Sequence, residues 1–294
     1  MNYAVVDTGS NTIRMSVYQW ENDTLCELYT EAVFANLAGH IEDNALTDAG
    51  IDACCDAILH HKNIAQEYGA EFHVFATAAI RNAKNCSYIT EKVKEKTGVA
   101  LEVLSGTDEA ELSFLGAIED FCVKSGVMAD VGGGSSEIIL FENGKTIATQ
   151  SIPLGSLKAY KNFVAGEIPT KEETDAIKSE ILEYIKSNEA LHSVRADCLC
   201  LVGGGVRAAK KLSKLVLNSE SLSVVGVECM LDTFISDEAS ISLFEKAVPK
   251  RKYTICPGLA IYSAIGRYFG ADKIYVSDKG IKEGYVKKYL VHQI

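Results

Sequence analysis

The sequence predicts an α/β protein built from two similar halves, and three observations support this. Strand-like apolar runs alternate with helical segments along the 294 residues. Two strand–turn–strand segments, one at Asp7 and one at Asp130, align with an offset of 123 residues. Glycine-containing turns follow apolar strand patterns at Gly9, at Gly132–Gly134 and at Gly203–Gly205. A repeat of this length predicts two halves, each presenting a loop to a common cleft.

Composition narrows the class of protein. The hydrophobic fraction of 47% and the charged fraction of 23% are ordinary for a globular protein. A net charge of −11 argues against a nucleic-acid surface. Because the chain is acidic overall, any site for a phosphate group must be built from N–H groups, a few basic side chains and a metal ion. The nine cysteines lack zinc or redox spacing, and the N-terminus lacks the pattern of a signal peptide. We therefore expect a cytoplasmic protein with reduced thiols and no membrane span.

The first half begins with a hairpin and a long helix. Ala4–Asp7 is a strand, and the turn Thr8–Asn11 leads into a second strand over Thr12–Val17. Helical spacing then runs over Thr47–Tyr68, and His60 and His61 on this helix are expected at the surface.

Two further segments of this half carry candidate functional residues. Small residues over Ala76–Ala79 open a helix with Arg81 in its first turn, where a guanidinium can bind phosphate. Asp108, Glu109 and Glu111 stand at another helix start, where the helix dipole alone would favour acids. The residues themselves do not decide which of the three is catalytic.

The second half begins with the most informative segment of the chain. Val127–Ala129 leads into Asp130, three glycines, two serines and Glu137. Successive N–H groups of such a turn form an anion-binding nest. Carboxylates at both ends make sense where a cation or an activated water lies between them. In the repeat, Arg14 aligns with Glu137. The two side chains could approach one phosphate from opposite sides, with Arg14 binding its oxygens and Glu137 acting as an acid.

The remainder of the second half is mostly helical. Leu199–Val202 is a buried-strand pattern, and Gly203–Gly205 then opens a helix that extends to Leu217, an arrangement that binds phosphate. Pro257-Gly258 opens a helix that Gly270 closes, and a terminal helix follows Gly280. The predicted domains are residues 1–122, with a C-terminal helix 281–294 packing back, and residues 123–280.

Three phosphate-type loops on two such halves resemble the actin, heat-shock ATPase and sugar-kinase superfamily, which has ribonuclease-H-like domains. The details are similar to the Ppx/GppA family of exopolyphosphatases and guanosine pentaphosphate phosphatases. The matching pieces, in family order, are Asp7-Thr-Gly-Ser-Asn-Thr, Ala76-Thr-Ala-Ala-Ile-Arg81, Ser105-Gly-x-x-Glu109-Ala, Asp130-Val-Gly-Gly-Gly-Ser-Ser-Glu137, Pro153-Leu-Gly, Gly203-Gly-Gly-x-x-Arg207-Ala, Gly258-Leu-Ala and Ser277-Asp-x-Gly-x-x-Glu283-Gly.

The resemblance implies two actin-like domains with an interdomain cleft, and it assigns roles. Glu109 corresponds to the catalytic carboxylate. Asp130 and Glu137 correspond to acids that assist the attacking water and hold a divalent ion, and Asp7 is a further candidate ligand. The expected phosphate-binding residues, from the loops and the resemblance together, are Gly9, Ser10, Asn11, Arg14, Arg81, Gly132, Gly133, Gly134, Ser135, Gly203, Gly204 and Gly205.

The resemblance also implies Mg²⁺ as cofactor and a homodimer as the assembly. This sequence departs from the family pattern at two motifs and in its length. Glu111 stands where many members carry arginine, and Cys256-Pro257-Gly258 replaces Pro-Ala-Gly. The chain is similar to the short family form, which lacks the C-terminal helical domains that extend the substrate channel of long members. The resemblance therefore does not imply processive action on long polyphosphate or specificity for guanosine pentaphosphate.

The expected reaction is Mg²⁺-dependent hydrolysis of terminal phosphoanhydride bonds in polyphosphate or guanosine pentaphosphate, with Glu109 as general base. The alternatives are an ATP-dependent small-molecule kinase of the same superfamily and a non-catalytic sensor of alarmones or polyphosphate.

Overall fold

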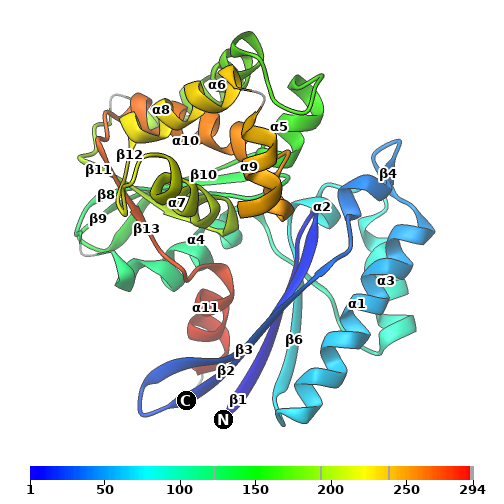
Figure 1. Cartoon of the computed structure of the whole chain (residues 1–294). Coiled ribbons are helices and arrows are strands. Elements are labelled where there is room, and N and C mark those ends of the chain that lie inside the picture. The colour runs from blue at the N-terminus through cyan, green and yellow to red at the C-terminus, as the bar shows by residue number, and fades with distance from the viewer. Residues whose placement is uncertain (122, 193, 238, 292–294) are drawn as a thin grey trace. The chain divides into compact units, whose positions relative to one another are not determined.

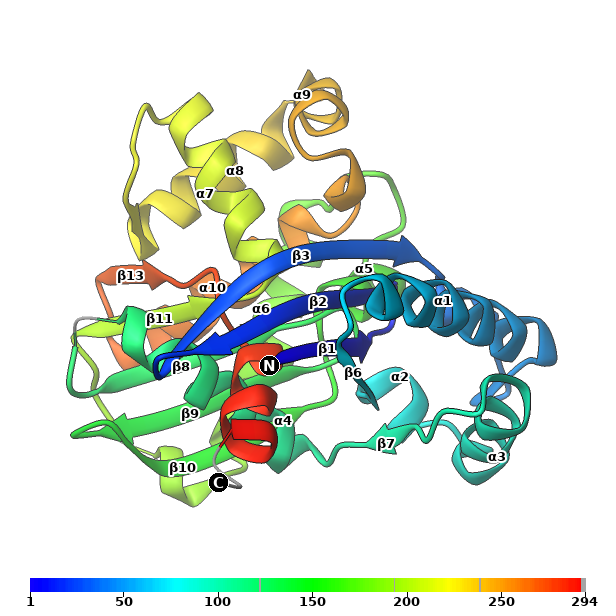
Figure 2. The same cartoon turned by 90° about the horizontal axis from the view of Figure 1, so that it is seen from below.

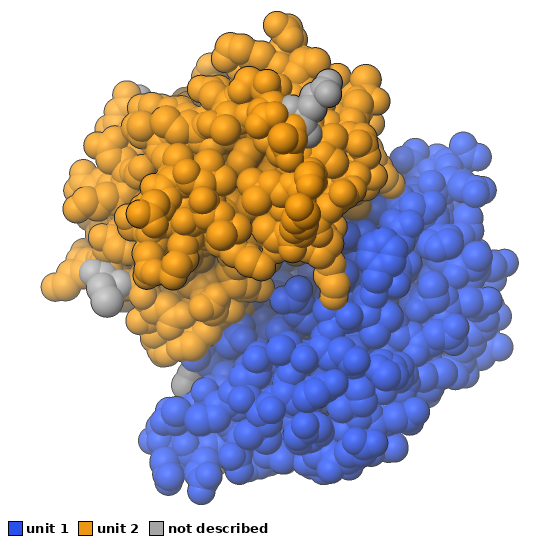
Figure 3. All heavy atoms as spheres, in the orientation of Figure 1, with its two compact units in different colours: residues 1–116, 281–294 blue, residues 117–280 orange. Residues whose placement is uncertain are grey.

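The computed structural model describes residues 1–121, 123–192, 194–237 and 239–291. Its contacts divide the chain into two compact units (Figures 1 and 3). Unit 1 contains residues 1–116 and the C-terminal segment from 281, and unit 2 contains residues 117–280. The observed boundary follows Gly116. Residue 122, where the sequence placed the boundary, and residues 292–294 of the expected C-terminal helix lie outside the described residues.

Unit 1 is organised on a five-stranded mixed sheet with the order β3-β2-β1-β6-β7. The first three strands are antiparallel neighbours, whereas β6 and β7 run parallel to β1. Its strands are β1 (Asn2–Thr8), β2 (Thr12–Glu21), β3 (Thr24–Phe34), β6 (Glu71–Ala76) and β7 (Glu102–Val103), with a small separate hairpin of β4 (Ile41–Glu42) and β5 (Ala45–Leu46). Its helical elements are η1 (Leu37–His40), α1 (Asp48–Glu67), α2 (Ala78–Arg81), α3 (Cys86–Thr97), α4 (Gly106–Ala117), α11 (Ile281–Tyr285) and the π-helical η5 (Val286–Val291).

Helices cover both faces of this sheet because side chains alternate along each strand. Ala4 and Val6 of β1 belong to the core cluster that includes α1 and α3. Tyr3 and Val5 belong to a second cluster, which includes Leu112 of α4 and residues of α11 and η5. The first residues of the chain and its C-terminal segment therefore share one core.

Helix α1 contains one clear error of the sequence prediction. Thr47 caps its N-terminus, as the periodicity indicated, and His60 is exposed. His61, expected at the surface, is completely buried. It lies three residues after Ile58 and four before Ala65, so helical spacing places it on the buried stripe. Burial lowers the pKa of His61 to about 4, and Glu31, 3.8 Å away, opposes the shift only in part.

We expect acid to destabilise unit 1 through His61. Its pKa falls from about 6.5 when unfolded to about 4 when folded, so the contribution is complete above pH 6.5 and is lost as the pH falls toward 4. The loss is on the order of 3 kcal/mol. Calorimetric unfolding across this range should show a smaller acid loss in His61→Leu, while His60→Gln, an exposed control, follows the wild type. Identical profiles for wild type and His61→Leu would contradict the prediction.

Unit 2 contains a six-stranded sheet with the order β10-β9-β8-β11-β13-β12 (Figure 2). Strands β10, β9 and β8 are antiparallel neighbours, β11 and β13 continue parallel to β8, and β12 is antiparallel to β13. Its strands are β8 (Gly126–Val131), β9 (Ser136–Glu142), β10 (Lys145–Ile152), β11 (Cys198–Val202), β12 (Leu222–Ser223) and β13 (Lys273–Val276). Its helical elements are η2 (Ile118–Asp120), α5 (Ser156–Phe163), α6 (Lys171–Lys186), η3 (Glu189–Leu191), α7 (Gly204–Val216), α8 (Val224–Ser236), α9 (Ala239–Ala247), η4 (Pro249–Arg251) and α10 (Ile255–Phe269).

Helix α10 is the centre of the unit 2 core. It packs against α5, α6, α7 and α8, and its residues from Ile255 to Gly266 are all buried. A helix that is apolar on every side requires such surroundings. It begins two residues before the predicted Pro257-Gly258 start, and it ends as predicted at Gly270, whose φ is 73°.

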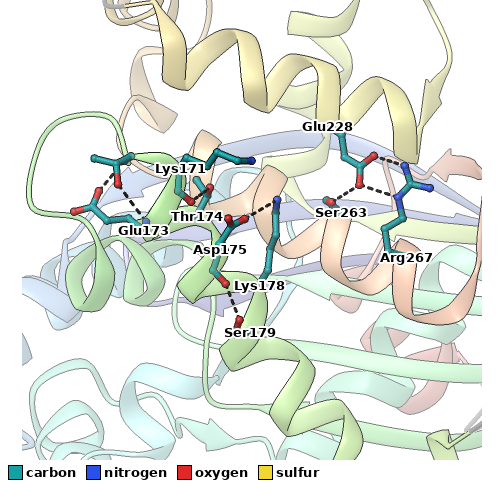
Figure 4. Close-up of polar contacts among 10 residues, drawn as sticks. Lys171, Glu173, Thr174, Asp175, Lys178, Ser179, Glu228, Ser263 and Arg267 are labelled. Carbon is teal, nitrogen blue, oxygen red and sulfur yellow. Dashed lines mark hydrogen bonds and ion pairs between the residues drawn. The ribbon is translucent and has the colours of Figure 1, made fainter.

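Figure 4 shows two groups of polar contacts on this helical layer, one in the first turns of α6 and one between α8 and α10. Thr170 and Glu173 form a reciprocal capping box at the start of α6. Glu228 of α8 accepts hydrogen bonds from Arg267 and Ser263 of α10. Arg267 is the main cause of the lowered pKa of Glu228, so this carboxylate ties α8 to α10 at neutral pH.

The internal repeat predicted from the sequence is confirmed by strand register. In unit 1, Asp7 lies opposite Arg14, and in unit 2, Asp130 lies opposite Glu137. The turns close in the same way: Gly9 N–H donates to the Thr12 carbonyl at 3.2 Å, and Gly132 N–H donates to the Ser135 carbonyl at 3.0 Å. Each unit therefore presents an equivalent hairpin from the first two strands of its sheet.

Candidate functional site

The predicted residues of unit 1 gather where the parallel strands end. Asp7 stands near the end of β1, and Thr77 N–H donates to the Thr8 carbonyl at 3.4 Å, which joins the start of α2 to this edge. The Ser10 and Asn11 carbonyls accept hydrogen bonds from Ala38, and from Ala35 and Asn36, respectively. In α/β folds, ligands bind at the carboxyl edge of the parallel strands.

Arg81 and Glu109 form an ion pair at this edge. Helix α2 is a single turn that ends at Arg81, so Arg81 lies in the first turn of this helix, as the sequence predicted. Arg81 Nη1 donates to Glu109 Oε2 at 2.6 Å and to the Leu104 carbonyl at 3.0 Å. The exposed fractions of the two side chains are 18% and 12%. The ion pair is mostly buried, but part of each side chain is accessible to solvent.

The structure distinguishes the three acids of α4 by their contacts. Asp108 accepts a hydrogen bond from Ser105 Oγ at 2.6 Å, and its own N–H donates to that oxygen at 3.1 Å, which is a helix cap. Glu111 faces outward and pairs with Lys288 at 3.1 Å. Only Glu109 is both buried and held by Arg81. Asp108 and Glu111 therefore have structural explanations, and Glu109 is the remaining candidate of the three for a chemical role.

In unit 2, Asp130 and Glu137 lie side by side on one face of the sheet. Residues directly opposite on antiparallel strands have Cβ atoms about 4.5–5.5 Å apart. Glu137 is 1% exposed, and Ser151 Oγ, from the facing position on β10, donates to its Oε1 at 2.9 Å. The two carboxylates form an oxygen-rich pair at the mouth of the glycine turn.

Hydrogen bonds from the start of helix α5 fix the orientation of the peptide groups in the glycine turn. The N–H of Ser156 donates to the Gly132 carbonyl, and those of Leu157 and Lys158 donate to the Gly133 carbonyl, at 2.9–3.0 Å. Because a trans peptide sets N–H opposite to C=O, the N–H groups of Gly133 and Gly134 point away from α5. Neither has a hydrogen-bond partner within the described residues. Two free amides in sequence can bind an anion.

We expect Gly155→Ala to disrupt this nest, because an added Cβ would lie 2.6 Å from the Gly132 carbonyl oxygen and 2.7 Å from the Ser135 nitrogen. The turn and α5 must separate, which should lower the free energy of unfolding by about 1–3 kcal/mol. Calorimetry measures this change. Gly166→Ala is the matched control, since its nearest atom would be 3.6 Å away. Equal stability of the two variants would argue against the close packing.

The third glycine turn meets the second at Asp130. Gly203 has a φ of 97°, which favours glycine, and a Cβ there would lie 3.1 Å from Asp130 Oδ1. Helix α7 begins at Gly204 without a side-chain cap. Its first N–H groups are therefore the kind that bind phosphate.

Arg251 is a site residue that the sequence reasoning missed. Its Nη2 lies 2.4 Å from the position of a Cβ on Gly204, so the guanidinium rests directly on the third glycine turn. The Tyr262 hydroxyl would lie 2.6 Å from a Cβ on Gly205, and burial is the main cause of the raised pKa of Tyr262. The only sequence signal was the basic run Lys250–Lys252, which ends five residues before Pro257. A bare basic run does not identify which residue faces the turn.

The hard oxygen donors of the second hairpin fit Mg²⁺. This ion is usually held by one or two carboxylates together with water and substrate phosphate. Asp130 and Glu137 supply such a pair. No group of three His, Cys, Asp or Glu side chains forms a ready-made metal cage in the part of the chain that is described, and Asp7 belongs to the hairpin of unit 1.

Comparison with known proteins agrees with this fold. The structure of the Aquifex aeolicus member of the Ppx/GppA family aligns with a TM-score of 0.82 and 23% identity over 100% of this chain and 99% of that one. An exopolyphosphatase structure from Cytophaga hutchinsonii aligns with a TM-score of 0.86 and 18% identity, covering 98% and 97% of the two chains. The fold is thus the two-domain actin-like α/β fold that the sequence predicted.

The family follows from the sequence match. Residues 33–292 match the model of the Ppx/GppA phosphatase family, and the chain belongs to that family. Exopolyphosphatase 1 of Mycobacterium leprae is 29% identical over 99% of this chain and 90% of its own length.

Other relatives are longer than this chain. The bifunctional 3-dehydroquinate synthase/phosphatase of Fusobacterium nucleatum is 26% identical over 94% of this chain, which spans 44% of that protein. The guanosine-5'-triphosphate,3'-diphosphate pyrophosphatase of Vibrio vulnificus is 24% identical over 96% of this chain, which spans 58% of that protein. None of the described helices is long and apolar enough to cross a membrane.

Proposed function

We propose that this protein hydrolyses terminal phosphoanhydride bonds and releases orthophosphate from inorganic polyphosphate or guanosine pentaphosphate. The observation that carries the proposal is the second hairpin, where two outward N–H groups lie beside the Asp130–Glu137 pair. Amides hold phosphate oxygens, and carboxylates at the same place would repel them unless a cation intervenes. The family and the M. leprae relative support the same reaction class.

In the proposed mechanism, the residues of unit 1 handle the water and its proton. The Glu109 carboxylate accepts a proton from water as the oxygen attacks the terminal phosphorus, and the bond from phosphorus to the bridging oxygen breaks. The proton then passes to solvent, leaving orthophosphate and a substrate shorter by one phosphate. Arg81 holds Glu109 through Nη1 alone, so its remaining N–H groups are available to a phosphate oxygen.

The residues of unit 2 bind and neutralise the phosphates. The amides of Gly133 and Gly134, with the loop through Ser135, carry oxygens of one phosphate. The start of α7 at Gly204, with Arg251 resting on it, carries further negative charge. Asp130 and Glu137 would hold Mg²⁺, which supplies charge neutralisation at the transferred phosphate.

The test is phosphate release from short polyphosphate, long polyphosphate, guanosine pentaphosphate and ATP, each with and without Mg²⁺. We expect Mg²⁺-dependent release from polyphosphate or guanosine pentaphosphate. Turnover of ATP only with a small-molecule acceptor would instead establish a kinase. Tight alarmone binding without release from any substrate would establish a sensor. The cytoplasmic location and the homodimer stay predictions, and light scattering of the purified protein tests the second.

A further inference from the structure

The C-terminal segment Ile281–Val291 belongs to unit 1 although it follows unit 2 in the chain. It is drawn in red in Figure 1 as α11 and the turn after it. The proposed mechanism uses none of its residues. Yet the segment contacts two parts of the unit 1 site, which are helix α4 and the first hairpin.

The contact with α4 is close and involves Leu112, one helical turn after Glu109. A Cβ on Gly284 would lie 1.8 Å from the Leu112 carbonyl oxygen, so only glycine allows this approach. Lys288 pairs with Glu111 on the same helix at 3.1 Å. Glu109 is in the first turn of α4, one turn before Leu112. The segment therefore fixes the helix that carries the proposed base.

The contact with the hairpin is made by Lys282. Its ammonium donates to Ser16 Oγ at 2.6 Å, and Ser16 has no exposed surface. Ser16 lies two residues after Arg14 on β2, so both side chains are on the same face as Asp7. Burial is the main cause of the lowered pKa of Lys282; the charge of Glu283 opposes this shift, that of Arg14 adds to it, and those of Glu27 and Asp7 oppose it.

Arg14 shows why a cation at this place matters. It lies directly opposite Asp7, where an ion pair across the strands would be favourable, but within the described residues it forms none. An arginine paired with Asp7 would be lost as a phosphate ligand. A second cation repels Arg14 and offers Asp7 another partner of opposite charge.

We propose that Lys282 is a positioning residue for the phosphate site of unit 1. The C-terminal segment places the Lys282 ammonium against Ser16 of the hairpin. There its charge attracts the Asp7 carboxylate and leaves the Arg14 guanidinium available to bind a substrate phosphate. The proposal rests on the phosphate site of the proposed function, but it concerns binding and not turnover.

The experiment measures binding of inorganic tripolyphosphate by calorimetry, without Mg²⁺, to the full chain. We expect Lys282→Met to weaken binding about tenfold, equivalent to about 1.4 kcal/mol. Lys282→Arg keeps the charge and should restore most of the affinity. Lys288→Met, a surface cation of the same segment, should bind as the wild type does. Wild-type affinity in Lys282→Met would overturn the proposal.

A double-mutant cycle separates positioning from general damage. If Lys282 acts through Arg14, then Lys282→Met adds little to the loss already caused by Arg14→Ala. Fully additive losses would show that Lys282 acts elsewhere. Should Lys282→Met not fold, Ser16→Ala removes the hydroxyl that bonds both Lys282 and Thr30, so Thr30→Val is its control, and Ser16→Ala must weaken binding more than Thr30→Val does. Because binding is measured without turnover, a protein that binds tripolyphosphate but releases no phosphate would refute the proposed function and not this inference.

Discussion

Glu109→Gln should lower the rate of phosphate release by about 10²–10⁴-fold, the usual contribution of a positioned general base. The amide keeps the size of the side chain and can still contact Arg81, but it cannot accept the proton of the attacking water. KM should change little, because the substrate contacts proposed for Arg81 and the glycine turns remain. Initial rates on short polyphosphate at saturating Mg²⁺ measure the effect.

Glu111→Gln is the matched control for this substitution. It makes the same chemical change on the same helix, two residues away, at an exposed carboxylate that pairs with Lys288. Its rate should stay within about twofold of the wild type, as expected for a surface ion pair that contributes little. A similar loss in both variants would point to damage to α4 and would remove Glu109 from the role of base.

Asp130→Asn and Glu137→Gln should each raise the Mg²⁺ concentration needed for half-maximal activity. The shift should be at least about 10–100-fold, the range found even for partners that only support a metal ligand. Each substitution removes one negative charge from the pair that faces the cation. Activity is measured against Mg²⁺ at fixed substrate, and binding of Mn²⁺ followed by paramagnetic relaxation gives a readout independent of turnover.

Glu142→Gln provides the control on the same strand. Glu142 is exposed near the far end of β9 and has no place in the proposed site. Its Mg²⁺ curve should overlay that of the wild type. Unchanged metal dependence in both Asp130→Asn and Glu137→Gln would exclude this pair as the metal site.

Features that depend on short-range pattern could be predicted from the sequence. The offset of 123 residues paired Asp7 with Asp130 and Arg14 with Glu137, and the strand registers agree, because a tight turn fixes which residues face each other. The glycine turns, the capping box at Thr170 and the end of α10 were likewise local.

Features that depend on tertiary packing could not be predicted. His61 follows helical spacing with Ile58, but the type of residue suggested a surface position. Arg251 reaches Gly204 from a turn 47 residues later, and nothing local marks it. The three acids of α4 were equivalent until their partners were known. The contacts of Arg251, Glu109 and Glu111 come from distant segments, and no local period encodes them, whereas His61 follows the local period and was misjudged by residue type.

The way in which the chain is threaded through its units has a consequence for biosynthesis. Unit 2 is one continuous stretch, whereas unit 1 begins the chain and needs residues from 281 onward to complete the core around Tyr3 and Val5. Domains generally fold as units during synthesis. Unit 2 can therefore finish folding on the ribosome before residues from 281 onward have been made to cover the apolar face of β1. A ribosome that stalls before residue 281 leaves a nascent chain with that face uncovered, a natural target for chaperones.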